Sequence, residues 1–497
     1  MLNSVEVLTP AQMRATEDAA IASGCVTAAQ LMEQAGKAVA DQIRLRWPVA
    51  GHATILCGAG SNGGDGYVIA HHLHRAGWRL RVLGMRAKAA GAAQSAASRW
   101  LQSGPILPLS IEELDQGAPS DVYVDAIFGT GLTRPPSKHI AVILKHIADT
   151  APDRIIAVDC PSGLNLDSGT VLTPCRAELT VAFDSPKPGH LTGDGPAVCG
   201  QLVIHDLHLQ MWRPTTAPRV TAAGPALAGS DRLDGAWLSK RHSQGHKFAH
   251  GSAVVIAGDR GKGGAARLSA RAALRVGAGL VTICPASRAM PEHTGQPDAL
   301  MRKPLDNAAD LNALLQDDRI GAVCLGPGCG TDRAAALLPA LLASRKPAVL
   351  DADALTALAA TSSPSLHPDC ILTPHGGEFA RLFPDLAKRL SDGKIDVLRQ
   401  AALCANAVVV LKGPDTIIAD PAGQVHIHSA FDIPWLATAG AGDVLAGIIT
   451  GLLARGQSPF AAASIGVTLH AKAARRFGPG LIADDLPDIL PSIINSE

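Results

Sequence analysis

The sequence predicts an α/β protein with two three-layer αβα domains. In both halves, short β-branched runs alternate with Ala- and Leu-rich segments of helical period, as in a parallel sheet with helices on both faces. The alternation stops over residues 213–230, where Pro, Thr, Ala and Gly dominate as they do in linkers. The chain has 497 residues, 47% of them apolar, which is enough for two hydrophobic cores. We therefore expect domains at residues 1–212 and 231–497, joined by a linker at 213–230.

Composition narrows the class of partner and the compartment. Lys+Arg and Asp+Glu both number 44 and the sequence pI is about 7.3, so no electrostatic footprint for nucleic acid or for a membrane surface is present. Small molecules are therefore the expected partners. The 10 cysteines lack any C-x-x-C pair, which is typical of free thiols in a reducing compartment. Neither a signal peptide nor an apolar run of membrane-spanning length is evident, so we expect a cytoplasmic protein.

The strand-like runs of the first half end in polar residues and glycines. These runs are "HATILCGAG" (52–60), "DVYVDAIFGTG" (121–131), "RIIAVDCPSG" (154–163) and "LTVAFDSPKPG" (179–189). In open α/β sheets, ligands bind outside the carboxyl ends of the strands. The residues that follow these four runs are therefore the candidates for a binding site.

The loop "GAGSNGGDG" (58–66) fits the dinucleotide pattern G-x-G-x-x-G between a strand and a helix. Two features disfavour an ordinary hydride-transferring Rossmann domain. The acid that such a domain places after its second strand is missing, since the segment there ends in Gly84, Met85 and Arg86. Arg86 could meet a 2′-phosphate, but Asp65 places a carboxylate in a loop that should welcome anions.

Three strand ends offer hard oxygen ligands. Asn62 supplies an amide carbonyl, Asp125 a carboxylate and Ser162 a hydroxyl, a set that suits a monovalent or other hard cation. The alternative is that Asn62 and Asp65 only bond the backbone of their own loop. Spacing does not decide between these two interpretations.

The strand-like runs of the second half lie at residues 251–259, 279–287, 321–330, 346–355, 370–378 and 407–420. Near the end, "WLATAGAGDVLAGIITGLLARG" places a Gly-Ala-Gly-Asp turn directly before an apolar helix. The backbone N–H groups of such a turn form an anion hole, and Asp443 can take a proton from an attacking hydroxyl, as phosphoryl transfer requires. Asp443 could instead merely cap the helix.

Other strand ends of the second half carry supporting groups. "LKGPDT" offers one cation, a glycine and a hydroxyl to a nucleotide, "LTPHGGE" places His375 and Glu378 at a strand end, and "LGPGCG" supplies glycines for close approach to a ligand. Each signal alone is weak, because a lone His is more often a satisfied residue and P-x-G runs are usually turns.

The first half resembles the NAD(P)HX epimerase domain of the YjeF N-terminal family. The resemblance rests on "LTPAQMRATEDAA", "LMEQAGKAVA", "GAGSNGGDG", "DAIFGTGLTRP", "VDCPSGLNLDSG" and "FDSPKPGHLTGDG", in that order. It implies a Rossmann-like domain that binds K⁺ at Asn62, Asp125 and Ser162, with Asp159 at the reacting ring. Ser61 stands where the family has a first asparagine. The residues implied to bind the hydrated dinucleotide are Ser61, Asn62, Gly63, Gly64, Asp65, Gly129, Thr130, Gly131, Leu132, Thr133, Arg134, Pro135 and Asp159.

The chemistry implied for this domain is simple. Reduced nicotinamide that has taken up water carries a hydroxyl on the carbon beside the ring nitrogen, and loss and re-addition of that hydroxyl through an iminium interconvert the R and S forms. One general acid or base is needed, for which Asp159 is the candidate. Lys187 could add positive charge, or could be a solvated loop lysine. Asp65 is a candidate sugar ligand or a brace of its loop.

The second half resembles the ribokinase-like NAD(P)HX dehydratases of the YjeF C-terminal type, over roughly Asp231 to Leu490. "GDRGKGGAARLSARAALRVGAGLVT", "LGPGCG", "VLDADAL", "LTPHGGE", "VLKGPDT" and "ATAGAGDVLAG" carry the resemblance. It implies contacts of the hydrated dinucleotide with Ala265, Gly328, His375 and Asp443, with Asp443 as the base. It further implies Mg²⁺ and a nucleotide, ADP or ATP, on Lys412, Gly413, Pro414, Asp415, Thr416 and Gly442.

Together the resemblances predict a bifunctional repair enzyme for NADHX and NADPHX. The second domain would phosphorylate the S form and expel phosphate, and the first would deliver the R form to it by epimerisation. One alternative is a ribokinase-like kinase with a stable phosphorylated product, and another is a nucleotide-binding sensor without turnover. We also expect a homo-oligomer, because apolar helices in both halves could make subunit contacts.

Overall fold

The computed structural model describes residues 2–85, 91–116, 119–215, 218–225, 227, 230–239, 247–361 and 366–497. The chain forms two compact units. The first unit comprises Glu6–Ala217, and the second comprises Met1–Val5 together with Pro218–Glu497.

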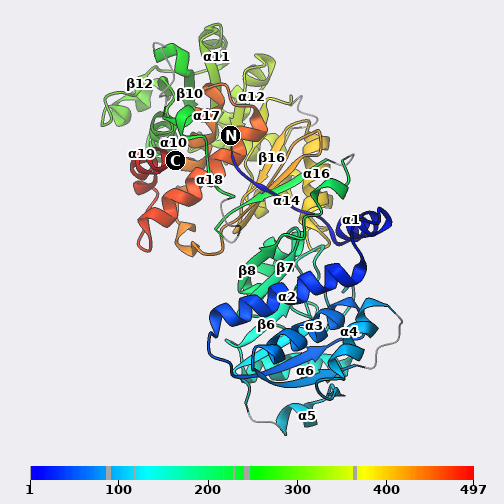
Figure 1. Ribbon diagram of the computed structural model, residues 1–497. Helices are drawn as coiled ribbons and strands as arrows, with labels where there is room; N and C mark the ends of the chain where they lie inside the picture. Colours follow the sequence, from blue (N-terminus) through cyan, green and yellow to red (C-terminus); the bar gives the residue numbers. More distant parts are fainter. Residues whose placement is uncertain are drawn as a thin grey trace. The chain divides into compact units, whose positions relative to one another are not determined.

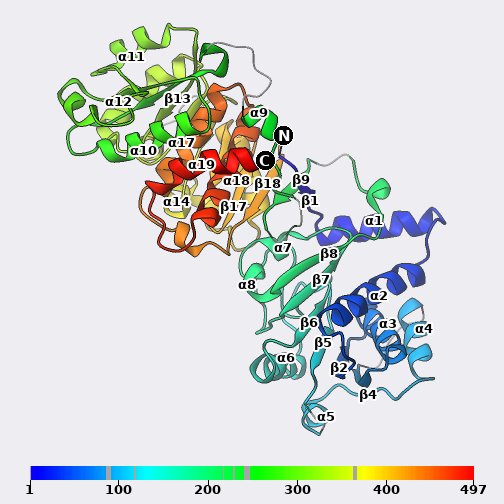
Figure 2. The same ribbon diagram turned by 60° about the vertical axis from the view of Figure 1, so that its left-hand side comes forward.

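The first unit is built on a seven-stranded sheet in which every neighbouring pair is parallel. The strand order is β4-β3-β2-β5-β6-β7-β8 (Figure 2). The strands are β2 (His52–Cys57), β3 (Arg79–Gly84), β4 (Leu107–Pro108), β5 (Val122–Ala126), β6 (Ile155–Val158), β7 (Leu179–Phe183) and β8 (Gln201–His205). The helices are α1 (Pro10–Ala22), α2 (Ala28–Arg46), α3 (Ser61–Arg75), α4 (Ala92–Trp100), α5 (Ile111–Asp115), α6 (Lys138–Thr150), α7 (Pro188–Leu191), α8 (Gly195–Cys199) and the 3₁₀ turn η1 (Gln210–Trp212).

Helices cover both faces of this sheet, as the fold class predicted. Consecutive residues of a strand point to opposite faces. Ile55 packs in a cluster with apolar residues of α2, α3 and α4, whereas Leu56 packs with those of α6. Both side chains are fully buried, so this unit has the expected three layers.

The second unit contains an eleven-stranded sheet with the order β1-β9-β18-β17-β16-β15-β14-β13-β10-β11-β12. β17 runs antiparallel to β16 and β18. The strands are β1 (Val5–Glu6), β9 (Val220–Ala223), β10 (Ser252–Ile256), β11 (Leu280–Cys284), β12 (Met301–Arg302), β13 (Ile320–Leu325), β14 (Ala348–Leu350), β15 (Cys370–Leu372), β16 (Val408–Leu411), β17 (Asp415–Ala419) and β18 (Val425–Ser429).

The helices of the second unit also cover both sheet faces. Val255 belongs to one apolar cluster with residues of α10, α17, α18 and α19. These four helices are labelled in Figure 1. Val254 and Ile256, which are also buried, face the other way. The helical segments are α9 (Gly235–Leu238), η2 (Lys247–His250), α10 (Gly263–Arg275), η3 (Ser287–His293), α11 (Ala308–Leu315), α12 (Thr331–Ala343), α13 (Asp353–Ala359), α14 (Gly376–Leu382), α15 (Pro384–Ala387), α16 (Lys394–Ala405), η4 (Pro434–Leu436), α17 (Ala441–Ala454), α18 (Pro459–Phe477) and α19 (Asp485–Ser496).

Two short segments differ from the expected division of the chain. Residues 220–223 were expected in the linker but form β9, which pairs in parallel with β18. Residues 1–5 were expected in the first domain but cluster with the second unit, where β1 neighbours β9. Both strands are too short for a periodic pattern, and they form because the sheet offers an edge with unpaired backbone groups.

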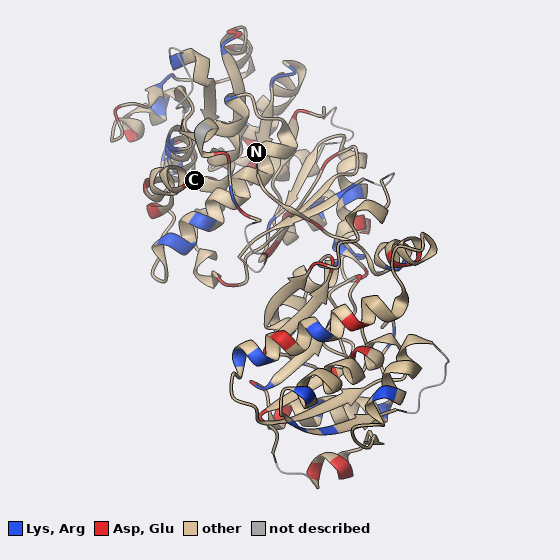
Figure 3. Ribbon diagram, in the orientation of Figure 1, with Lys and Arg blue, Asp and Glu red and all other residues tan. Residues whose placement is uncertain are grey.

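The exposed helix faces carry charges of both signs, which are interspersed in Figure 3. On α2, for example, Lys37 Nζ lies 2.6 Å from Asp41 Oδ2, and Arg44 pairs with the same carboxylate. In the described part of the chain, no helix is both long enough and apolar enough to cross a membrane.

α17 packs closely on α10 because it presents glycine at the contact. A Cβ added to Gly447 would lie 2.6 Å from the Cα of Ser269, which is closer than real side chains approach backbone. This contact holds the middle of α17 against the middle of α10.

We predict that Gly447→Ala lowers the free energy of unfolding of the second unit by about 1–3 kcal/mol, as overpacking does. Gly264→Ala in α10 is the control, because its added Cβ meets nothing within 4 Å. Denaturant unfolding measures both variants. Equal stability of Gly447→Ala and wild type would show that α17 and α10 can move apart to accept the added methyl group without loss of stability.

Candidate active sites

The first site lies where the strand order of the first sheet reverses. From β2 the chain proceeds outward to β3 and β4, and then returns to β5 on the other side of β2. Such a switch point opens a crevice at the carboxyl ends of the strands. A cavity of about 780 Å³ lies there, and its lining includes the predicted residues Ser61, Asn62, Asp65, Gly129, Thr130, Gly131, Leu132, Thr133, Arg134 and Asp159.

Of the residues predicted to bind the dinucleotide, three are not part of this lining, namely Gly63, Gly64 and Pro135. The two glycines have a packing reason instead. A Cβ on Gly63 would lie 2.6 Å from the carbonyl carbon of Gly58, and one on Gly64 would lie 2.5 Å from the Met32 side chain. The glycine loop thus lets the first turn of α3 approach the preceding strand end and α2. A ligand contact for these residues stays a prediction.

Asp159 is held in a strained and fully bonded position. Its φ of 64° is in the left-handed region, which Asp tolerates better than most residues. Lys187 Nζ lies 3.1 Å from Asp159 Oδ1, and the Thr130 N–H donates to Oδ2 at 3.0 Å. The Asp159 and Lys187 side chains are only 9% and 1% exposed. Lys187, which could have been a solvated loop residue, is therefore a buried partner of Asp159.

His190 stabilises this turn as a neutral imidazole. Burial lowers the pKa of His190 to about 4. Its Nδ1 accepts from the Lys187 N–H at 3.1 Å, so Nε2 carries the proton and donates to the Asp159 carbonyl at 2.9 Å.

Two of the three oxygen ligands predicted for a cation, Asp125 and Ser162, are in direct contact. Ser162 donates to Asp125 twice, from N to Oδ2 at 2.8 Å and from Oγ to Oδ1 at 2.6 Å. Burial raises the pKa of Asp125. Asn62 Oδ1 would lie 3.1 Å from a Cβ on Gly129, which lines the same cavity, and its Nδ2 is buried without a partner among the described residues. A buried carboxylate with adjacent amide and hydroxyl oxygens fits a hard monovalent cation. Within the described residues no His/Cys/Asp/Glu cluster suited to a metal ion occurs.

The structure also explains the acid in the glycine loop. Burial raises the pKa of Asp65 well above its usual value, and the charges of Asp159 and Glu17 raise it further. A raised pKa lowers the negative charge of this carboxyl group and so weakens its repulsion of a phosphate. Arg86, considered for a 2′-phosphate, lies outside the described residues.

The cavity has a wall that the sequence interpretation missed, formed by Met13, Arg14 and Glu17 of α1. Burial raises the pKa of Glu17 to about 7 against the attraction of Lys187. These residues lie within the quoted motif "LTPAQMRATEDAA". Their spacing of three and four residues could have indicated a shared helix face, but no pattern there indicated chemistry.

In the second unit, the helices α10 and α17 begin at one place. A Cβ on Gly328, whose φ is 61°, would lie 3.3 Å from Cβ of Ala265. Ser269 Oγ lies 3.2 Å from the Ala265 carbonyl and 2.7 Å from the Asp443 carbonyl, and thus connects the first turns of the two helices. The predicted substrate residues Ala265, Gly328 and Asp443 are therefore neighbours.

A charged group surrounds Lys412 beside Asp443. Lys412 Nζ lies 2.7 Å from Asp351 Oδ1, 3.9 Å from Glu378 Oε2 and 3.4 Å from where a Cβ on Gly442 would be. Burial, followed by the negative charge of Asp351, raises the pKa of Asp443 to about 6. A carboxyl group with this pKa is suited to accept a proton near neutral pH.

The remaining predicted residues lie around Lys412. The backbone of His375 forms an isolated parallel β-bridge with that of Lys412. The His375 Nδ1 accepts a hydrogen bond from the Gly377 N–H at 3.0 Å, and the ring is largely exposed. Thr416 Oγ1 donates to the Gly413 carbonyl at 2.7 Å, and Asp415 pairs with Lys394 at 2.5 Å. Residues 412–416 thus form a tight turn that enters β17, with Pro414 at its centre.

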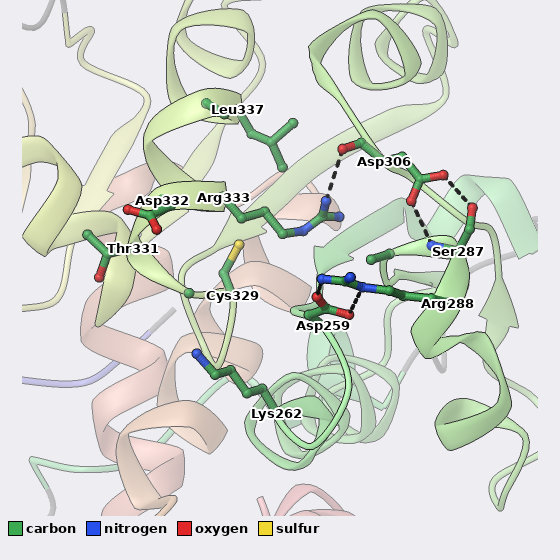
Figure 4. A pocket seen from close by; sticks show the side chains of 13 residues that line it. Asp259, Lys262, Ser287, Arg288, Asp306, Cys329, Thr331, Asp332, Arg333 and Leu337 are labelled. Atoms are coloured by element: carbon green, nitrogen blue, oxygen red, sulfur yellow. Dashed lines mark hydrogen bonds and ion pairs between the residues drawn. The ribbon is translucent and has the colours of Figure 1, made fainter.

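A second cavity of about 790 Å³ lies beside Gly328, lined by the adjacent Cys329 and Gly330 and by Lys262 (Figure 4). Arg288 Nε donates to Asp259 at 2.6 Å, and Arg333 donates to the carbonyls of Leu305 and Ala257. The Lys262 backbone N–H donates to the Asp259 carbonyl at 3.1 Å, whereas its exposed side chain has no hydrogen bond or ion pair among the described residues. It is thus the lysine in this cavity that remains available to a ligand.

Fold and sites define a two-site α/β enzyme in which a Rossmann-like unit precedes a ribokinase-like unit. Residues 28–189 match the family described as YjeF-related protein N-terminus, and residues 253–494 match NAD(P)H-hydrate dehydratase. The bifunctional NAD(P)H-hydrate repair enzyme Nnr of Coxiella burnetii is 37% identical over 97% of this chain and 98% of its own length. The chain therefore belongs to the family of bifunctional NAD(P)H-hydrate repair enzymes.

Other comparisons cover most or half of the chain. The Escherichia coli (strain K12) enzyme of the same name is 34% identical over 95% of this chain and 90% of its own. Among solved structures, the ADP/ATP-dependent NAD(P)H-hydrate dehydratase from Bacillus subtilis, co-crystallised with ATP/Mg²⁺, is 29% identical with a TM-score of 0.45. It covers 52% of this chain and 93% of its own.

We predict that Lys187→Met destabilises the first unit by about 3–5 kcal/mol, because it leaves the Asp159 carboxylate buried without a cation. Lys145→Met is the matched control, because the Lys145–Asp149 pair is 62% and 61% exposed and is expected to contribute less than about 1 kcal/mol. Differential scanning calorimetry measures both. Similar small shifts for the two variants would contradict a buried ion pair at Asp159.

Proposed function

We propose that each unit carries one reaction of NAD(P)H-hydrate repair, with epimerisation in the first unit and nucleotide-dependent dehydration in the second. Membership of the bifunctional family gives the two activities. The observation that supports the division is that each unit has a buried carboxylate beside a lysine at the carboxyl ends of its strands.

In the first unit, Asp159 faces the hydrated nicotinamide ring. The hydroxyl leaves as water with the electron pair of its C–O bond, the ring nitrogen lone pair forms an iminium, and water adds to the other face. Asp159 exchanges the proton of the hydroxyl, while Lys187 fixes the carboxylate orientation. The cavity lining within residues 61–65 and 129–135, which excludes Gly63, Gly64 and Pro135, would hold the rest of the substrate.

Asn62, Asp125 and Ser162 would hold K⁺ in this unit. The support is their hard oxygens and the burial of the Asp125 carboxyl group against Ser162. When bound, the ion supplies positive charge beside the substrate phosphates, which lets carboxyl groups and phosphates share one site.

In the second unit, Asp443 takes the proton of the carbinol hydroxyl, whose oxygen attacks the terminal phosphoryl group of a nucleotide. The N–H groups at the start of α17 stabilise the charge that develops on that group. The P–O bond to the rest of the nucleotide breaks, which releases AMP when ADP is used. Inorganic phosphate then leaves the ring carbon with the C–O electron pair as the nitrogen lone pair forms the iminium. Loss of a proton from the neighbouring ring carbon restores NADH or NADPH.

The nucleotide would bind at Lys412, Gly413, Pro414, Asp415, Thr416 and Gly442. ADP is the expected co-substrate, with AMP and phosphate as products. Asp351 and Glu378, whose carboxylates face Lys412, would hold Mg²⁺ together with the nucleotide phosphates. When bound, the ion neutralises phosphate charge during transfer.

The substrate would contact Ala265, Gly328 and His375 in this unit. The cavity beside Gly328 then offers room for the remainder of the dinucleotide, with Lys262 next to its phosphates. This placement would put the hydrated ring toward Asp443 and the rest of the substrate away from the nucleotide.

A cytoplasmic location and homo-oligomers are part of the proposal. All 10 cysteines are free thiols, which is typical of a reducing compartment. An apolar groove along α12, lined by Leu338, Pro339 and Leu342, supports a subunit contact.

We predict the behaviour of single variants that are given a mixture of R and S hydrates with ADP. The measurement is the recovery of reduced-nicotinamide absorbance. Wild type recovers all of it, and Asp443→Asn recovers none because its base is lost. Asp159→Asn gives a fast phase limited to the S fraction, followed by slow spontaneous epimerisation. Asp385→Asn, at a side chain that is 91% exposed, is the control and behaves as wild type. Complete and fast recovery by Asp159→Asn would contradict the division of labour.

A further inference from the structure

Glu17 is a carboxyl group of the first cavity that the mechanism above leaves unused. It lies near the middle of α1 and shares a helix face with Met13, four residues earlier, and Arg14, three residues earlier. All three line the cavity that also contains Asp159 and Lys187. Acidic side chains therefore reach the cavity both from α1 and from the end of β6.

Hydrogen bonds fix α1 relative to Lys187. The Leu8 N–H, just before α1, donates to Ser185 Oγ at 3.1 Å and to the Pro186 carbonyl at 3.2 Å. Ser185 Oγ in turn donates to the Glu6 carbonyl at 2.7 Å. The segment that begins α1 is thus bound to the loop that ends at Lys187, so Glu17 is positioned by the same turn that positions the partner of Asp159.

The charges around Glu17 come from every element of this wall. Lys187 follows β7 and attracts its carboxylate, whereas Asp159 after β6, Asp184 after β7 and Asp18 on α1 repel it. Asp65 of α3 is coupled to it as well, and Arg14 and Arg134 are the other charged residues of the lining. Burial raises the pKa of Glu17 by more than the attraction of Lys187 lowers it, so this pKa rises from 4.5 to about 7. Near neutral pH, Glu17 is therefore present both as an acid and as a base.

We propose that Glu17 is a second acid–base residue of the epimerase site, which protonates the departing hydroxyl while the Asp159 carboxylate receives a proton from the incoming water. This assignment rests on the proposed function of the first unit. Two carboxyl groups of different environment in one site commonly divide the roles of acid and base.

The proton balance of this step is complete. In the R to S direction, Glu17 gives its proton to the carbinol oxygen, and water leaves with the C–O bonding pair as the nitrogen lone pair forms C=N. Water then adds to the opposite face, the C=N pair returns to nitrogen, and the extra proton passes to Asp159. The S to R direction begins from this protonated Asp159 and the ionised Glu17. Between successive R to S turnovers, solvent takes the proton from Asp159 and returns one to Glu17, so no other reactant is consumed.

The test compares Glu17→Gln with Asp18→Asn, an exposed neighbour on the same helix. Purified R hydrate and ADP are supplied, with an excess of the Asp159→Asn chain to dehydrate the S form. For Glu17→Gln we expect the epimerisation kcat to fall by at least about 100-fold, as loss of a general acid does, with KM changed by less than about twofold. Asp18→Asn is expected to match wild type.

The pH profile distinguishes proton transfer from a structural effect. In wild type, kcat/KM for the R to S direction should fall as pH rises through about 7, because Glu17 loses its proton. That limb should be absent from the residual activity of Glu17→Gln. Unchanged epimerisation in Glu17→Gln, or persistence of the limb, would overturn the assignment, whereas failure of wild type to epimerise would overturn the proposed function itself.

The fold of the variant is checked separately. A folded-state pKa above the unfolded value means that stability is lost as pH rises from about 4.5 through about 7, and glutamine removes this loss. Glu17→Gln should therefore unfold at the same temperature as wild type or higher at pH 8, and it should dehydrate S hydrate at the wild-type rate. A lower unfolding temperature would count against the assignment, because it would indicate that Glu17 braces the fold.

Discussion

Each site depends on a carboxylate and a lysine held together at the carboxyl end of a sheet. Asp159 pairs with Lys187 in the first unit, and Asp351 pairs with Lys412 in the second. Removing either charge alone would leave the other buried without a partner, which would lower the free energy of unfolding by several kcal/mol. The loops around each pair are therefore constrained to one arrangement, and Asp159 accepts a left-handed backbone conformation to reach its partner.

The two units use this constraint for different chemistry. In the first, the charged pair lies among further carboxyl groups whose pKa values are raised, which suits the exchange of protons with a hydroxyl. In the second, Lys412 lies between carboxylates and the glycine turn of α17, which suits a phosphorylated group. Phosphorylation converts a poor leaving group into a good one, so elimination needs no stronger acid. Epimerisation on the same chain gives this step access to both forms of the hydrate.

Much of this arrangement could be predicted from the sequence. The βα alternation indicated both sheets, and polar residues at the ends of buried strands indicated Asn62, Asp125 and Ser162, because parallel strands end at one edge of a sheet. The resemblance to the epimerase family indicated Asp159. The ion pairs could not be predicted, since they join loops distant in sequence. Glu17 was missed because it lies in an ordinary helix, where a carboxylate is usually solvated. The strands β1 and β9 were missed because the sheet edge, and not their own pattern, makes them extended.

Phosphorus NMR of the complete reaction tests directly whether the second unit transfers a phosphoryl group to the hydrate and then eliminates phosphate. Wild type is supplied with S hydrate and ADP, and phosphorus species are counted against reduced nicotinamide restored. We expect one AMP and one inorganic phosphate for each NADH or NADPH formed, with no lasting phosphate ester. An ester that accumulates while absorbance stays low would contradict it and would identify the second unit as a kinase.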